Sequence, residues 1–346
     1  MCDDALVDEL ADLIANSHAR WMPRVVESVL GTRDPVFVAE ALTRAVADAL
    51  AVPVVAARFY EPGVGIVAGL ELADGRAIVA KVHRATFVAG ERLAAIARVQ
   101  ADLVVAGVPA PAPLAGPLAF ADGWLTVEEL RDGDRADGYD PAVRRCMATA
   151  LHSLVDAARP HARNGWIGHW LGEPVLDSLW PEPHDLHFDF TRTSSGAEAI
   201  DDAARTARSV LAATELPYVV GHLDWRVQNL AFAGRRVCAI YDWDSIGLVP
   251  EAALVGSASA IHPVDWRLAL PDPLPTVEQV DGFVADYEST RGAPFNDDER
   301  EILAAAQRWV VSYGARCQHS DNVLGVFPDV DHSKGWPRLL RDLMGR

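Results

Sequence analysis

The sequence predicts an α+β protein with two lobes. Residues 51–135 contain short runs of β-branched residues separated by turn-forming residues, which indicates a small antiparallel sheet. Residues 136–346 show mostly helical spacing of apolar side chains, interrupted by one pair of strands around Gly234. Residues 1–50 carry leucines at spacings of three and four, so we expect a helical extension before the sheet.

Four strands and one helix are expected in the first lobe. "VPVVAARFYE", "GIVAGLELA" and "RAIVAKVH" are strand candidates within residues 52–83, separated by the turn signals "PGVG" and "ADG". An amphipathic helix follows and ends at Gly107, because the prolines within residues 109–113 forbid its continuation. "GWLTVEEL" is the fourth strand, and the polar segment "RDGDRADG" is expected to link the lobes.

Composition excludes some partners. The formal net charge is −18, which disfavours nucleic acid and anionic membranes because both would repel the chain. The charge is compatible with a cationic ligand, or with solubility alone. The four cysteines form no C-x-x-C pair, and we find neither a secretory signal nor a membrane span. We therefore expect reduced thiols and a cytoplasmic location.

Residues with catalytic chemistry follow a predicted strand. "GHLDWRVQN" at residues 221–229 places Asp224 on a loop shortly before Asn229. The segment from Asn229 to Asp242 is predicted to be a hairpin, so its two ends should lie side by side. Carboxylate and amide oxygens suit Mg²⁺ carrying a phosphate chain. If Asp224 stays off the metal, it can accept a proton from an alcohol.

Lys81 is a candidate phosphate ligand in the first lobe. The chain has 31 basic residues but only two lysines, Lys81 and Lys334. Lys81 lies within the apolar strand "AIVAKV", where a compact ammonium suits a nucleotide phosphate. The alternative is a strand-end lysine whose stem packs on apolar surface while its ammonium reaches water.

These motifs resemble a known family. H-x-D-x₄-N at residues 222–229, followed by D-W-D at residues 242–244, is similar to the catalytic loop and metal motif of the aminoglycoside phosphotransferase and choline kinase family. The resemblance implies a protein-kinase-like fold, ATP and Mg²⁺ as cofactors, and a small-molecule hydroxyl acceptor. It implies that Asp224 is the catalytic base and that Asn229 and Asp242 hold the metal.

The resemblance also assigns nucleotide contacts in the first lobe. Lys81 resembles the phosphate-binding lysine of the third kinase strand, and Glu91 in the next helix would be its ion-pair partner, unless Glu91 is merely exposed. Gly63 and Gly65 resemble the glycine-containing loop that covers the phosphates. The backbone that hydrogen-bonds adenine would belong to Glu128, Glu129 and Leu130.

The catalytic loop departs from the common family pattern. Leu223, Trp225 and residues 226–228 differ from the usual residues, which leaves phosphoryl transfer expected but puts the acceptor in doubt. Arg226 would either touch the acceptor or transferring phosphate, or pair with an acidic side chain. His222 would buttress the loop, and Asp244 is a supporting residue of the metal motif.

The acceptor site is expected within residues 160–217, where tryptophans lie among acidic residues. Aromatic faces beside carboxylates suit a cationic or sugar-like ligand, with Asp185 and Asp189 as contacts. Alternatively the tryptophans are core and the acids are solvated. We expect an aminoglycoside-like or other amine-bearing acceptor. A metabolic sugar or amino-sugar kinase and a non-catalytic nucleotide-binding protein are the alternatives.

Overall fold

The computed structural model describes residues 4–18, 24–168, 178–268, 270–326, 331 and 333–346. The chain forms two compact units. The first, here called the sheet unit, comprises residues 1–104, 111–131 and 184–187. The second, the helical unit, comprises residues 105–110, 132–183 and 188–346. The division after residue 131 falls in the polar segment "RDGDRADG".

A five-stranded antiparallel sheet forms the centre of the sheet unit, with strand order β1-β2-β3-β5-β4. Its strands are β1 (Val54–Pro62), β2 (Ile66–Leu72), β3 (Ala77–Arg84), β4 (Pro113–Phe120) and β5 (Gly123–Glu129). Sequence reasoning did not predict β4, because its prolines argue against a central strand. β4 lies at the edge of the sheet, where the N–H groups that proline lacks are not all needed.

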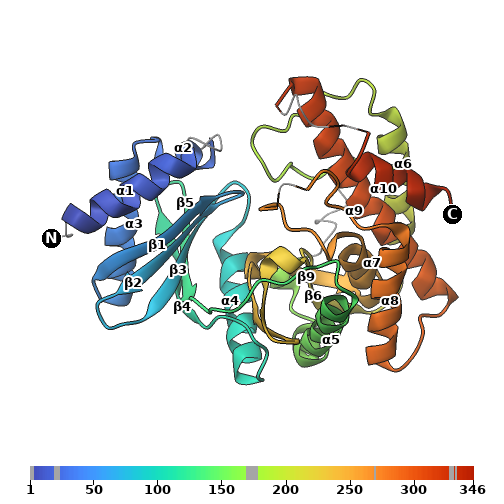
Figure 1. The fold of residues 1–346 in the computed structure, drawn as a ribbon, viewed down its shortest axis with the longest axis horizontal. Coiled ribbons are helices and arrows are strands. Elements are labelled where there is room, and N and C mark those ends of the chain that lie inside the picture. The colour runs from blue at the N-terminus through green and yellow to red at the C-terminus, as the bar shows by residue number, and fades with distance from the viewer. Residues whose placement is uncertain (1–3, 19–23, 169–177, 269, 327–330, 332) are drawn as a thin grey trace. The chain divides into compact units, whose positions relative to one another are not determined.

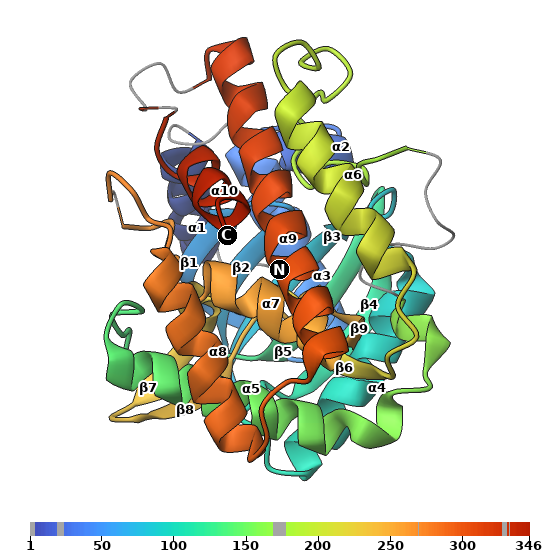
Figure 2. The same cartoon turned by 90° about the vertical axis from the view of Figure 1, so that its right-hand side faces the viewer.

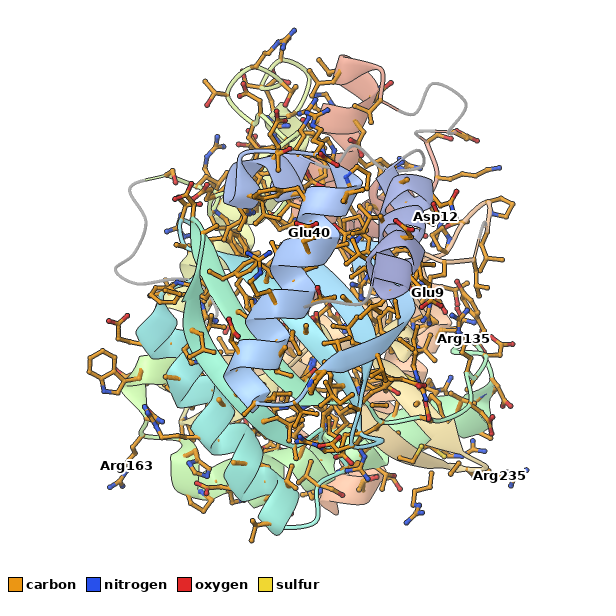
Figure 3. The ribbon with its side chains drawn as sticks, turned by 90° about the vertical axis from the view of Figure 1, so that its left-hand side faces the viewer. Glu9, Asp12, Glu40, Arg135, Arg163 and Arg235 are labelled. Carbon is orange, nitrogen blue, oxygen red and sulfur yellow. The ribbon has the colours of Figure 1, made fainter. Side chains whose placement is uncertain are left out.

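Three N-terminal helices cover one face of this sheet (Figure 1). They are α1 (Asp4–His18), α2 (Arg24–Leu30) and α3 (Pro35–Leu50). Leu10 and Leu42 on α1 and α3 belong to the same buried cluster as Ile66 and Val82 of the sheet. The helices therefore complete the core of the sheet unit. Their exposed side chains include Glu9 and Asp12 on α1 and Glu40 on α3 (Figure 3).

Helix α4 (Gly90–Val105) contacts the opposite face, where its Gln100 donates to Glu128 of β5 at 3.0 Å. Alternation along β3 places Lys81 on the face opposite to Val82, which is buried against the N-terminal helices. A Cβ added to Gly90 would lie 3.0 Å from the Trp124 ring, so the absence of a side chain lets the start of α4 approach β5. This face carries the candidate nucleotide residues of the sheet unit.

α-Helices build most of the helical unit (Figure 2). They are α5 (Pro141–Ala158), α6 (Glu198–Ala212), α7 (Glu251–Ile261), α8 (Val277–Arg291), α9 (Asp297–Leu324) and α10 (Trp336–Met344). Every residue from Ala252 to Ile261 is buried, so α7 is a central helix, and α9 packs along it. No helix within the described ranges has the length and apolar character needed to cross a bilayer.

Two short strand pairs complete the helical unit and carry the candidate catalytic residues. β6 (Tyr218–His222) pairs with β9 (Ile246–Pro250), and β7 (Leu230–Ala233) pairs with β8 (Arg236–Ile240). The β7–β8 turn uses Gly234 at φ +60°, a left-handed conformation that glycine adopts at little cost. The β7–β8 pair was predicted from the sequence, whereas β9 was not.

Candidate active site

The loop that carries Asp224 is fixed by its neighbours. β6 ends at His222, and the Leu223 N–H then donates to the Ser245 carbonyl at 2.9 Å. The Val227 N–H donates to the His262 carbonyl at 2.8 Å. Trp225 is fully buried and anchors the loop from inside. Since the backbone is held on both sides of Asp224, its carboxylate has a defined position.

One oxygen of the Asp224 carboxylate is contacted by three side-chain nitrogens. The Asn229 side-chain amide donates to Oδ2 at 2.8 Å. Nε and Nη2 of Arg226 lie 3.0 and 2.8 Å from the same oxygen. None of these bonds involves Oδ1, and the side chain of Asp224 is 29% exposed. One carboxylate oxygen is therefore anchored by these contacts and the other is not; contact of Asp224 with a substrate hydroxyl stays a prediction.

Asn229 and Asp242 lie side by side at the base of the β7–β8 hairpin. Leu230 pairs with Ile240, and the next Tyr241 N–H donates to the Asn229 carbonyl at 2.8 Å. Because the Asn229 amide nitrogen binds Asp224, its amide oxygen remains for a metal. Asp242 has φ 63° and ψ 47°, a left-handed conformation that is rare outside glycine and is often found at functional sites.

This donor set fits Mg²⁺ bound together with a nucleotide. One amide oxygen and one carboxylate are hard ligands of the kind that Mg²⁺ prefers. The described part of the chain contains no cluster of three His, Cys, Asp or Glu side chains that could hold a metal. A metal held by one amide oxygen and one carboxylate would need phosphate oxygens and water to complete its coordination.

His222 connects the two halves of this site. Its side chain is 1% exposed, and Nε2 donates to the Tyr241 carbonyl at 2.8 Å. Its ring stands edge-on to Trp225 and Trp243, with centroid distances of 5.7 and 6.5 Å. His222 thus ties the loop of Asp224 to the segment that enters Asp242. Asp244 lies next to these residues in the short turn Trp243–Ser245.

In the sheet unit, Lys81 lies against a carboxylate of the neighbouring strand. Its Nζ is 3.1 Å from Oε1 of Glu128, and both side chains are almost fully buried. Burial of the ammonium disfavours the alternative of a solvent-reaching lysine. Glu91 is exposed in the first turn of α4, so the ion pair between Lys81 and Glu91 stays a prediction.

The two glycines of the β1–β2 turn differ in whether the structure has room for a side chain. A Cβ on Gly65 would lie 2.4 Å from the Val82 carbonyl oxygen, so a side chain is excluded by close packing against β3. A Cβ on Gly63 would meet nothing within 4 Å. Packing against β3 is sufficient to account for a glycine at position 65, with no ligand needed. The role of Gly65 over a phosphate stays a prediction.

Two of the backbone donors expected at adenine are already used by the sheet. The Glu129 N–H donates to the Ala112 carbonyl at 2.9 Å, and the Leu130 N–H donates to the Ala77 carbonyl at 2.9 Å. Adenine binding by residues 128–130 stays a prediction. In this conformation it would have to use their carbonyl groups, or open one of these bonds.

The two acceptor candidates are engaged locally. Oδ1 of Asp185 lies 2.9 Å from His187 Nδ1 and accepts from the His187 N–H at 3.1 Å. Burial raises the pKa of Asp185, but these hydrogen bonds outweigh it and lower the pKa below its usual range. Asp189 accepts the Arg192 N–H at 2.8 Å and is otherwise exposed. Their contact with an acceptor stays a prediction.

The tryptophans within residues 160–217 differ in burial. Trp180 is buried, stacks on Trp309 at a centroid distance of 5.4 Å and donates to Asp201 at 2.9 Å. It is therefore a core residue, whereas Trp166 is 67% exposed. Trp170 lies outside the residues that the structure describes.

Sequence reasoning missed the side chain of Glu128 and assigned no role to Gln100. Gln100 on α4 donates to Glu128 Oε2 at 3.0 Å and to the Pro111 carbonyl at 2.8 Å. The signal that could have found Glu128 is the β3–β5 register, which places Lys81 opposite Thr126. Glu128 then lies two residues along on the same face, but that strand order is not evident from the sequence.

Comparison with known proteins gives a family match. The model of the phosphotransferase enzyme family matches residues 70–294, more than half of the chain. This range includes Lys81, Asp224, Asn229 and Asp242. A search of curated proteins gives no match.

Solved structures match the fold at low sequence identity. An amicoumacin kinase solved with AMP-PNP and Ca²⁺ is 14% identical with a TM-score of 0.61, covering 83% of this chain and 86% of that one. An ethanolamine kinase from Plasmodium vivax is 11% identical with a TM-score of 0.53, covering 96% and 92%. A macrolide 2'-phosphotransferase from Brachybacterium faecium is 13% identical with a TM-score of 0.50, covering 83% and 93%. The expected α+β fold of protein-kinase type is confirmed.

Proposed function

The chain belongs to the phosphotransferase enzyme family, and from this premise we propose that it transfers the γ-phosphoryl group of ATP to a hydroxyl of a small molecule. The observation that carries the proposal is the carboxylate of Asp224, anchored at Oδ2 by Asn229 and Arg226 and open at Oδ1. An anchored carboxylate with one open oxygen suits a group that orients and deprotonates an alcohol.

Each further residue has a role in this reaction. Lys81 would provide positive charge for the nucleotide phosphates, and the Asn229 and Asp242 oxygens would hold Mg²⁺. Bound Mg²⁺ would offset the negative charge of the phosphate chain. The acceptor hydroxyl donates its proton to Asp224 as its oxygen bonds to the γ-phosphorus, and ADP leaves with the electrons of the broken P–O bond.

Arg226 has two uses in this scheme. Its guanidinium lies 2.8 Å from Asp224 and offsets the charge of that carboxylate. A phosphate brought next to a bare carboxylate would be repelled, so this offset favours the approach of the γ-phosphate. The same guanidinium has donors left over that can bind the transferring phosphoryl group.

For the acceptor, we propose a molecule that carries a hydroxyl and an amine. The support is the net charge of −18 and the exposed or half-exposed carboxylates at residues 182–189. The similar solved structures include kinases named for amicoumacin and for ethanolamine, which is an amino alcohol. A metabolic sugar or amino-sugar kinase is the second candidate, since burial of Trp180 removes one aromatic face expected at a cation.

A non-catalytic nucleotide-binding role is disfavoured, because the lysine, the base and both metal ligands are all present. We also propose that the enzyme works in the cytoplasm. Cys146, Cys238 and Cys317 are free thiols, which suits a reducing compartment.

A screen of acceptors with an ADP-release assay tests the proposal. The panel should pair amine-bearing alcohols with neutral sugars of similar size, each with Mg²⁺ and ATP. We expect acceptor-dependent ADP release that disappears in Asp224→Ala. Release that is independent of every acceptor, or is unchanged in Asp224→Ala, would refute transfer to a hydroxyl by this site.

A further inference from the structure

Lys81 forms a buried ion pair within the sheet. Glu128 on β5 offers its Oε1 to Lys81 at 3.1 Å, and its Oε2 accepts from Gln100 at 3.0 Å. The side chains of Lys81 and Glu128 are 10% and 11% exposed. Gln100 is 3% exposed and is tied in turn to the Pro111 carbonyl at 2.8 Å. Both oxygens of the carboxylate are thus occupied by donors from different elements.

The position of this carboxylate makes it a rigid partner. β3 and β5 are hydrogen-bonded neighbours, and Lys81 pairs directly with Thr126. The distance between Lys81 and Glu128 is therefore set by the register of two strands. An ion pair to Glu91 would instead depend on where the first turn of α4 lies. The backbone positions of Lys81 and Glu128 are fixed by strand pairing and do not depend on the first turn of that helix.

Electrostatics also require a partner at this place. A lysine ammonium buried without an opposite charge is strongly disfavoured and would lose its proton. A neutral amine would no longer attract phosphate. Since Glu128 is itself buried and hydrogen-bonded, its charge is screened little by water, so its attraction for Lys81 is strong.

We propose that Glu128 is the positioning residue for Lys81, in the role that the family resemblance gives to Glu91. The inference rests on the proposed function, because it takes Lys81 to be the lysine that binds the nucleotide phosphates. Glu128 acts through Lys81 and does not touch the reacting atoms. Gln100 provides the link from α4 to this pair by fixing the second carboxylate oxygen.

Matched variants of the two glutamates test this inference. Glu128→Gln keeps the shape and a hydrogen-bonding oxygen but removes the charge, and Glu91→Gln makes the same change on exposed α4. Mg·ATP affinity should be measured by calorimetry without acceptor, together with kcat and KM. We expect Glu128→Gln to weaken Mg·ATP binding or lower kcat/KM for ATP by about tenfold or more, with an unaltered acceptor KM. Glu91→Gln should change neither by more than about twofold.

A double variant separates positioning from general damage to the sheet. If Glu128 acts through Lys81, the loss in Lys81→Ala/Glu128→Gln should equal the loss in Lys81→Ala alone. Losses that multiply would show that Glu128 acts independently of Lys81, and would overturn the proposal. A strong loss in Glu91→Gln together with normal binding by Glu128→Gln would overturn it as well.

Further controls separate a folding defect from loss of binding, and the failure of this inference from the failure of the proposed function. If Glu128→Gln does not fold, Glu128→Asp takes its place, since it keeps the charge but is one methylene too short for the contact at 3.1 Å. Wild-type Mg·ATP affinity in a folded Glu128→Asp would then contradict the proposal. A wild-type chain that binds Mg·ATP but phosphorylates no hydroxyl would refute the proposed function and leave this inference standing. A wild-type chain that binds no Mg·ATP would refute both.

Discussion

Asn229 donates its side-chain amide to Asp224 twice, to the carboxylate at 2.8 Å and to the backbone carbonyl at 2.9 Å. One buried side chain therefore fixes both the position of the proposed base and the direction of its own amide oxygen. In the scheme proposed above, these two hydrogen bonds hold the base and a metal ligand together, so a change at Asn229 should affect both metal binding and proton transfer.

The first prediction concerns Asp224. Asp224→Ala removes the proton acceptor and should lower kcat by about 10²–10⁴-fold, the range for losing a positioned base. Mg·ATP binding and thermal unfolding should change little, because the side chain is partly exposed. Steady-state kinetics and differential scanning fluorimetry measure the two effects. Asp202→Ala on the exposed surface of α6 is the control, and near-wild-type turnover of Asp224→Ala would remove Asp224 from the role of base.

The second prediction concerns Asp242. Asn tolerates the left-handed backbone at this position, so Asp242→Asn should keep stability while removing the one charged side chain of the proposed Asn229–Asp242 metal site. We expect the Mg²⁺ concentration needed for half-maximal activity to rise about tenfold or more, with a smaller effect on acceptor KM. A titration of activity with Mg²⁺ at fixed ATP measures this. An unchanged Mg²⁺ requirement would mean that Asp242 does not bind the metal.

The third prediction concerns Arg226, which contacts Asp224 through Nε and Nη2. Arg226→Met keeps much of the apolar stem and removes the charge, so kcat should fall by about tenfold or more, with acceptor KM little changed. Arg226→Lys should restore only part of the rate, because an ammonium cannot reproduce the planar guanidinium. Wild-type kcat in Arg226→Met would indicate that the pair with Asp224 is structural only.

The fourth prediction concerns pH and His262. Burial lowers the pKa of His262 to about 3. The hydrogen bond that its Nδ1 donates to the Ser259 carbonyl opposes this shift, and the charge of Arg144 adds to it. Because the folded pKa lies below the unfolded value of about 6.5, the folded state binds the proton less well. The contribution of His262 to the free energy of unfolding is fully present above pH 6.5. It falls as the pH drops toward 3, by at most about 1.4 kcal/mol per pH unit.

His262→Asn tests this sign, because an amide can replace the hydrogen bond at Nδ1 but does not titrate in this range. The Tm of the variant should depend less on pH between 6.5 and 4 than the Tm of the parent. Since the His262 carbonyl holds the Val227 N–H, acid should also loosen the loop of Asp224. An identical slope in both proteins would assign the acid sensitivity to other groups.

The sequence was sufficient for those parts of the fold and site that depend on local pattern. The N-terminal helices, the strands β1–β3 and β5, and the β7–β8 hairpin follow from spacing and turn residues. The placement of Asn229 beside Asp242 follows from that hairpin, because a hairpin brings its own ends together.

The missing parts depend on contacts between distant segments. β4 was hidden because edge strands tolerate proline, and β9 because its partner β6 lies far away in the chain. The contact between Lys81 and Glu128 needs the pairing of β3 with β5 across the intervening α4 and β4. From the sequence, Arg226 could either touch the acceptor or transferring phosphate, or pair with an acidic side chain. Only the loop conformation shows that its guanidinium pairs with Asp224.

The last prediction concerns the acceptor. Asp185 is held ionised by His187, and Asp189 closes a turn through the Arg192 N–H, so each carboxylate is fixed in place before any ligand arrives. Asp185→Asn and Asp189→Asn remove one negative charge each with little change of shape. For an amine-bearing acceptor, at least one of them should raise acceptor KM by about threefold to tenfold at saturating ATP, because a charge-assisted hydrogen bond is lost. A neutral sugar of similar size should show no such change, and Asp202→Asn should affect neither. If acceptor KM is unaltered in both variants and the neutral sugar is phosphorylated as well as any amine, the proposal of a cationic acceptor is wrong. The chain is then better described as a sugar kinase.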